Sequence, residues 1–458
     1  MAKIIVNSFR TTVNRFQRDI AVSLSPNLTD NTKSLSRNAK LLAWAIFLMF
    51  FIEGGTLGIL PKNFYFVYRN MRISDFILYG LIIYSFFKVK EYEKLFNSRS
   101  LFVIKILLLY LFLEFVGSAI IYNYNIIELF FRLKFIWTSF LVFPFLLLLR
   151  RNALQYLIKI MFPVVIVSNF LYILCSLTGI AFLPDVSIVK QTLPGGFKIY
   201  RVYGGTFYGD VYFLGFIYFW ITKKFKPRQL VVFLLFVLPH ILSFGRGSWL
   251  FYLFTIGVLF IWNSLKNKNL KTVIKQIAVF ATFLFVLIFV FTKFIPQANY
   301  LTEAIESRIE QGKEDYKYKE GTYGSRLVNT KALVELWSNS NHLLGIGMHP
   351  LWVLEPLTEQ EYIYYWGFCD IKWAGVLAAY GLIGFLLFII FEIYYGILAF
   401  KILKHTKTKD IYVFFAILLL SSEIYASFSY NILNIGLFGP SIIVSFYVAA
   451  AVYKYENP

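Results

Sequence analysis

Three arginines in glycine-containing stretches are the residues of this chain whose type and setting most clearly suggest chemistry. Arg246 lies in SFGRGSWL and is the one formally charged residue between Gln229 and Leu265. Arg326 lies in GTYGSRL and Arg201 in YRVYGGTFYGD. A guanidinium binds phosphate oxygens in pairs, and the glycines that flank Arg246 let backbone amides approach a ligand. Together they predict a clamp for a diphosphate; the alternative is that each arginine snorkels to lipid headgroups or pairs with an acid.

Proton transfer needs a base, and two residues are candidates. Asp370 begins the apolar run DIKWAGVLAAYGLIGFLLF, where a partly desolvated carboxylate suits a general base. The alternative is an N-cap, a position that aspartate favours. His349 is a second candidate base, with an exposed loop histidine as its alternative reading. Further acids in or near apolar runs either line a path or pair with Lys105, Lys159 or backbone groups: Glu53, Asp75, Glu114, Asp210, Glu392 and Glu423.

Motifs for metals and nucleotides are absent from the sequence. There is no Walker A run, no GxGxxG, no CxxC and no Asp-x-Asp, and the histidines at 240, 342, 349 and 405 are scattered. The sequence therefore predicts no metal and no cofactor. Cys175 and Cys369 are either a pair near the outer helix ends or, as we expect, small packing residues.

The composition indicates an integral membrane protein. Of 458 residues, 58% are hydrophobic and 15% charged, whereas soluble domains carry about 25% charged residues. Apolar runs of about 17–25 residues predict membrane-spanning helices, because lipid leaves no partner for exposed backbone groups. We expect an all-α polytopic protein with about twelve spans: 41–61, 73–88, 101–122, 135–149, 153–175, 206–222, 229–245, 247–263, 276–294, 373–400, 411–430 and 436–453.

The net charge is +20, and the distribution of the basic residues along the chain predicts how the protein is oriented in the membrane. Basic residues are concentrated in short segments that share one side if the N-terminus is cytoplasmic, which favours a membrane topology over nucleic-acid binding. Both termini are then predicted in the cytoplasm, and no cleavable signal peptide precedes the first span. The run 229–265 is too long for one helix, so Gly245-Arg246-Gly247 is predicted as a tight turn at the outer face.

The predicted organisation has five parts. A basic cytoplasmic segment (1–40) precedes spans one to nine (41–294), an outer loop (295–372), spans ten to twelve (373–453) and a cytoplasmic tail (454–458). In the outer loop, TEAIESRIEQGKEDYKYKE and SRLVNTKALVELW predict amphipathic helices, the second with Leu333 and Trp337 on one face and glycines at 345 and 347 after its end. A shorter outer loop, 176–205, contains LPGGFKIYRVYGG.

Taken in order, these stretches resemble the O-antigen polymerase and O-antigen ligase superfamily of bacterial membrane glycosyltransferases. SFGRGSWL is similar to the family's Ser-x-Ser-Arg-Gly turn, with Gly245 where serine is usual. RVYGGTFYGD, SRLVNTKALVELWSNSNHLLGIG and DIKWAGVLAAYGLIG are similar to its arginine-glycine, Arg…Trp…Gly-x-Gly and following-span segments. Many ligases open the last segment with His-Asn, where this chain has Asp370-Ile371. The resemblance covers roughly residues 195–390.

The resemblance implies a GT-C-like fold and inverting transfer of an undecaprenyl-diphosphate-linked oligosaccharide without metal or nucleotide, at the outer face of the bacterial cytoplasmic membrane. Arg246 and Arg326, with Arg201 as a third member, would stabilise the diphosphate leaving group, and Asp370 would accept the proton. The expected function is polymerisation of repeat units, with donor, acceptor, membrane lipids and a chain-length regulator as partners. A ligase with another acceptor and a flippase or transporter of lipid-linked sugars are the alternatives. The absence of an internal repeat and the off-centre long loop weaken the transporter.

Overall fold

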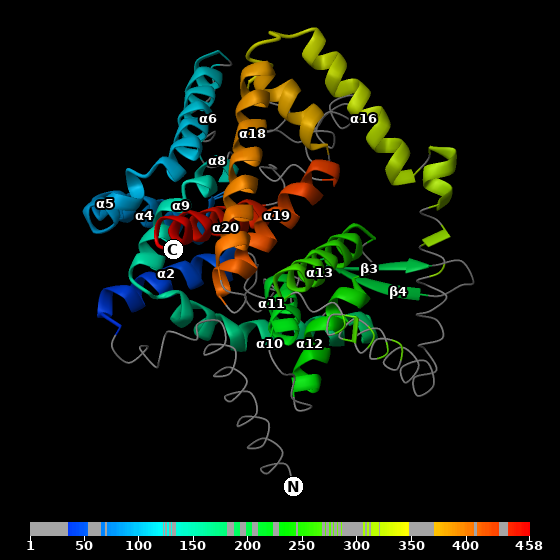
Figure 1. Cartoon of the computed structure of the whole chain (residues 1–458). Helices are drawn as coiled ribbons and strands as arrows, with labels where there is room; N and C mark the ends of the chain where they lie inside the picture. The colour runs from blue at the N-terminus through cyan, green and yellow to red at the C-terminus, as the bar shows by residue number, and fades with distance from the viewer. Residues whose placement is uncertain are drawn as a thin grey trace.

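The protein is described here from a computed structural model. It describes residues 35–53, 66–68, 71–121, 134–180, 187–192, 198–203, 209–222, 229–243, 246–267, 313–319, 321–347, 371–406, 410–429 and 438–458, with a few isolated positions between them. Figure 1 shows a mainly helical molecule.

The elements follow one another in this order: α2 (Arg37–Glu53), β1 (Phe66–Tyr68), β2 (Met71–Arg72), α4 (Ile73–Phe87), η3 (Val89–Tyr92), α5 (Glu93–Phe96), η4 (Arg99–Leu101), α6 (Phe102–Ile121), α8 (Lys134–Ser139), α9 (Val142–Arg150), α10 (Leu154–Thr178), β3 (Ser187–Thr192), β4 (Lys198–Tyr203), α11 (Gly209–Thr222), α12 (Gln229–Leu242), α13 (Arg246–Asn267), α16 (Gly321–Ser338), α18 (Lys372–His405), α19 (Ile411–Ser429) and α20 (Phe438–Glu456).

Most predicted spans coincide with helices, as for α4, α6, α10, α11 and α19. The predicted span 135–149 is instead two short helices, α8 and α9, and the predicted span 276–294 lies mostly outside the described residues. Within the described part, four helical stretches are long and apolar enough to cross a membrane: Arg99–Ile121, Leu154–Thr178, Trp249–Lys266 and Lys372–His405. The prediction of membrane helices is confirmed to that extent, and the number twelve stays a prediction.

The described residues are mainly helical, in line with the all-α expectation, and two short antiparallel hairpins lie between the helices. β1 pairs with β2, and β3 pairs with β4 in a register that sets Ser187 opposite Tyr203 and Thr192 opposite Lys198. The second hairpin occupies the predicted loop 176–205, where alternating side chains in KIYRVY suit a strand. It packs against α10, where the Tyr200 ring lies over Gly179, the left-handed residue that ends the helix.

Helix α18 is bent sharply, where the sequence predicted one continuous span. Gly381 has φ 58° and ψ −163°, a conformation open essentially to glycine alone. Lys372 and Glu392 form an ion pair, although a straight helix would hold them about 30 Å apart at 1.5 Å per residue. The chain therefore folds back at Gly381 into a short limb, 372–380, and a long limb, 382–405, seen in Figure 1 as two orange limbs meeting at an angle.

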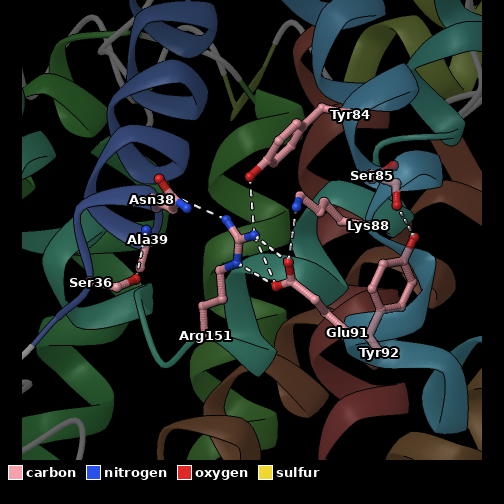
Figure 2. A network of polar contacts seen from close by, with 9 residues as sticks. All are labelled: Ser36, Asn38, Ala39, Tyr84, Ser85, Lys88, Glu91, Tyr92 and Arg151. Atoms are coloured by element: carbon pink, nitrogen blue, oxygen red, sulfur yellow. Dashed lines mark hydrogen bonds and ion pairs between the residues drawn. The ribbon is translucent and has the colours of Figure 1, made fainter.

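At one end of the bundle a polar network joins the start of α2 to the ends of α4 and α9 (Figure 2). Arg151 makes paired hydrogen bonds to Glu91 (2.9 and 3.0 Å) and further ones to the Tyr84 hydroxyl and the Asn38 carbonyl. Nearby, the Tyr92 hydroxyl donates to the Ser85 carbonyl (3.0 Å), and burial raises the pKa of this phenol to about 12. Because Arg151 precedes α10, this network lies at the opposite end of α10 from the β3–β4 hairpin.

Candidate functional site

The predicted arginine turn falls at the junction of two helices. α12 ends at Leu242 and Arg246 is the first residue of α13, so the run is divided into two helices as expected, but Arg246 and Gly247 belong to α13 and not to a turn. The Trp249 indole and the Ser243 hydroxyl each donate to the His240 carbonyl at 2.8 Å. These bonds satisfy a carbonyl at the end of α12 and fix the angle at which α13 departs. The side chain of Arg246 lies outside the described residues.

A polar cluster joins three helices close to this junction. Asp210, on the first turn of α11, accepts a hydrogen bond from the Tyr252 hydroxyl of α13 (2.6 Å) and lies 3.2 Å from Nδ1 of His240 on α12. The imidazole is buried between the Phe213 and Tyr252 rings, whereas half of the Asp210 side chain is exposed. The cluster thus ties together the helix ends that present Arg246. Asp210 was among the acids singled out in the sequence, but its partners come from two other helices and no spacing rule brings them together.

Arg201 lies on β4, opposite Val189 in the hairpin. The hairpin leads into α11, so the backbone of Arg201 lies at the same end of the bundle as Asp210. Its side chain lies outside the described residues, and its meeting with Arg246 stays a prediction.

Arg326 is half-buried on α16. The helix begins at Gly321, which places Arg326 in the second turn, where the field of the helix end is weaker than expected for a residue at the start. Its carbonyl accepts a hydrogen bond from Thr330, but the buried Nε has no hydrogen-bond partner among the described residues. A buried guanidinium N–H without a partner is costly, so a ligand oxygen at this position would be stabilising. On the same helix Leu333 is buried and the partly buried Trp337 packs against the same apolar core, while the amphipathic character of the helix stays a prediction.

The glycine motif after α16 clasps the bend of α18. A helix broken at Gly381 loses the bonds from Leu382 N to Ala378 O and from Ile383 N to Ala379 O. The segment 342–347 replaces both, with these bonds: Ile346 N to Ala378 O (3.0 Å), Gly347 N to Ala379 O (2.9 Å), Leu382 N to His342 O (2.9 Å) and Ile383 N to Leu343 O (3.1 Å).

Close approach explains the glycines at both sides of this contact. Gly345 and Gly347 have φ of 70° and 66°, and a Cβ on Gly345 would come within 2.5 Å of the Ala379 carbonyl. A Cβ on Gly381 would overlap the Leu343 carbonyl. The two glycine motifs noted in the sequence, LLGIG and GLIG, are therefore two halves of one backbone interface.

The two candidate bases, Asp370 and His349, lie outside the described residues. The N-cap of α18 is Ile371, so the alternative reading of Asp370 as the N-cap is wrong. Two other acids accept hydrogen bonds from backbone amides at helix starts: Asp75 from the Arg72 amide at 2.7 Å, and Asp410 from the Tyr412 amide at 2.9 Å.

A buried ion cluster was missed in the sequence. Lys372, at the start of the short limb, contacts Glu392 of the long limb and lies 3.8 Å from Glu423 on α19. In the sequence analysis, Lys105 and Lys159 are candidate partners for acids in or near the apolar runs. Lys105 instead donates to the Phe96 carbonyl and lies over the Phe96 ring. Only the fold-back at Gly381 brings Lys372 to Glu392.

Comparison with known proteins adds one match. Residues 214–389 match the family model described as O-antigen ligase. These residues, 214–389, are similar to that family and are called the O-antigen ligase family segment below. This confirms the predicted resemblance to the O-antigen ligase and polymerase superfamily. A search of curated proteins finds no match to the chain.

The O-antigen ligase family segment runs from α11 through the bend of α18. It includes Arg246, Arg326 and Lys372, whereas Arg201 and Asp210 precede it. Arg246, Arg326 and the bend at Gly381 thus belong to the part of the chain that matches the family model.

Proposed function

We propose that this chain is a membrane glycosyltransferase that polymerises undecaprenyl-diphosphate-linked oligosaccharide repeat units into a surface polysaccharide. The reaction would take place at the outer face of the cytoplasmic membrane, with both termini in the cytoplasm. The observation that carries the proposal is the O-antigen ligase family segment. It contains Arg246 at a helix junction and Arg326, whose buried Nε has no partner among the residues that the structure describes.

The chemistry follows from the leaving group. Negative charge develops on the lipid diphosphate as the anomeric bond breaks, and guanidinium groups placed in advance stabilise that charge in a water-poor site. Arg246 and Arg326 are the proposed clamp, with Arg201 as a third member. Asp370 is the proposed base for the acceptor hydroxyl, with His349 as the alternative base. A chain-length regulator is a further proposed partner.

Polymerase is favoured over ligase by the entry into α18. Many ligases have His-Asn there, and this chain has Asp370-Ile371. A ligase would need the same donor site and would differ in its acceptor, so the acceptor decides between them.

The assay uses the purified full chain, reconstituted in lipid, with a lipid-linked repeat unit as substrate. A ladder of products supports the polymerase. Transfer to an added foreign lipid acceptor without a ladder supports the ligase, and no new glycosidic bond with movement of the substrate across the bilayer supports a transporter.

Arg246→Ala should abolish polymer formation while the protein remains in the membrane at its normal level, because the developing diphosphate charge loses a donor. Polymer yield and chain length are measured by gel, and membrane content by immunoblot. Polymer of normal amount and length would remove Arg246 from the mechanism.

Asp370→Asn should bind the lipid-linked substrate but lose turnover, because an amide cannot accept the proton. Substrate binding and turnover are measured separately on the purified variant. Full turnover would exclude Asp370 as the base, and the same pair of measurements on His349→Gln would then test the alternative.

A further inference from the structure

The ion cluster formed by Lys372, Glu392 and Glu423 joins three helical segments inside the bundle. The exposed fractions of the three side chains are 3%, 13% and 7%. Ionisable groups buried among membrane helices are expensive, and those that are kept usually serve a function. The site and its proton transfer, as proposed above, do not use this cluster.

The cluster lies deep in the bundle along the long limb of α18. At 1.5 Å per residue the long limb, 382–405, is about 36 Å long, and Glu392 lies about 16 Å from the bend at Gly381. Lys372 lies at the far end of the short limb, about 13 Å from the same bend. Both limbs therefore reach the cluster at a similar distance from the bend.

Polar contacts attach the short limb at both of its ends, in addition to the ring contacts of Trp373 with Phe385 and Tyr380 with Phe388. At the bend, the segment 342–347 replaces the missing helix bonds and the Tyr110 hydroxyl donates to the Tyr380 carbonyl at 2.8 Å. At the other end, Lys372 joins the limb to Glu392 and Glu423. The N-cap, Ile371, makes no side-chain capping hydrogen bond. The ion cluster therefore fixes the N-terminal end of the short limb, which a capping side chain would otherwise do.

We propose that Lys372 is a positioning residue, which fixes the N-terminal end of the short limb through its contacts with Glu392 and Glu423. The proposal rests on the proposed function, since the residue positioned is the base Asp370, two places earlier in the chain. Catalytic groups lose efficiency steeply when displaced by an ångström, which gives a reason for such a hold.

Removing one member of a buried ion cluster leaves charges without partners and can unfold the protein, whereas neutralising all members together is far better tolerated. The test variant is therefore Lys372→Met combined with Glu392→Gln and Glu423→Gln. We expect it to remain folded, with KM for the lipid-linked repeat unit little changed and kcat reduced by about tenfold or more, on the scale of a misplaced catalytic group.

Glu392→Gln alone is the second variant, because it keeps the Lys372–Glu423 contact and so a balanced pair of charges. It loosens the short limb from the long limb, and we expect the same fall in kcat at unchanged KM. The matched control is Lys454→Met, which removes the ion pair between Lys454 and Asp410 (3.1 Å) and should leave kcat unchanged. Wild-type kcat in either cluster variant overturns the proposal.

A second readout does not depend on activity. In a background with Cys175→Ser and Cys369→Ser, Ile371→Cys reports on the start of the short limb through its rate of reaction with a maleimide. The triple neutral variant should react about fivefold faster or more, because local opening of a loosened segment exposes it. An unchanged rate overturns the proposal. If the wild-type chain forms no glycosidic bond, the proposed function is wrong. The rate of maleimide reaction at Ile371→Cys then still shows whether the ion cluster fixes the short limb.

Discussion

At the scale of single residues, the most informative side chain is Arg326. Most buried polar atoms in proteins have partners, and each exception asks for a reason. The Nε of Arg326 is such an exception among the described residues, and it lies on a helix within the O-antigen ligase family segment. Binding of a diphosphate oxygen would supply the missing partner.

Arg326→Ala should therefore lower the rate of glycosidic bond formation by about 10²-fold or more, as the loss of a donor to a developing oxyanion does elsewhere. The rate is measured with the lipid-linked repeat unit under single-turnover conditions. The control is Lys331→Ala, an exposed cation on the same helix. Equal rates for the two variants would mean that Arg326 does not contact the leaving group.

At the scale of elements, the bend in α18 shows what the sequence could and could not predict. Apolar length located α4, α6, α10 and α19 closely, since the bilayer fixes how long an apolar helix must be. The division of the run 229–265 into two helices was predicted because the run exceeds one span. The bend at Gly381 was not predicted, because the sequence does not reveal whether a glycine in an apolar run adopts a helical φ or a positive one. The pairing of Lys372 with Glu392 was missed for the same reason, since it exists only after the chain folds back.

The bend can be tested with two glycines of α18. Gly381→Ala forces a side chain into a conformation costing about 1–3 kcal/mol and against the Leu343 carbonyl, so the clasp should open. We expect a lower midpoint of thermal unfolding in detergent and a loss of transfer activity. Gly396→Ala is the control, since nothing lies within 4 Å of its added Cβ, and alanine there favours a helix by about 1 kcal/mol. Equal stability of both variants would contradict the bend.

At the scale of the whole molecule, polar contacts show which segments lie together at each end of the bundle. The connection between α4 and α6 binds Arg151 through Glu91, and it binds the C-terminal helix through a hydrogen bond from Ser100 to Glu456 (2.6 Å). The start of α2 joins the same network through Asn38 (Figure 2). The described start of the chain and its C-terminus therefore share one end, and the β3–β4 hairpin and the start of α13 at Arg246 share the other.

The membrane orientation predicted from the basic residues can be tested by cysteine labelling, because the two ends of the bundle are known. The background variant carries Cys175→Ser and Cys369→Ser. Lys94→Cys probes the network end, and Lys190→Cys, on β3, probes the hairpin end; both positions are exposed. Because basic segments stay in the cytoplasm, an impermeant maleimide should label Lys190→Cys in intact cells and Lys94→Cys only after permeabilisation. Glu335→Cys, exposed on α16, should behave like Lys190→Cys. The reverse pattern would put Arg246 in the cytoplasm, on the side away from a polymer growing outside the cell, and would rule out the proposed site.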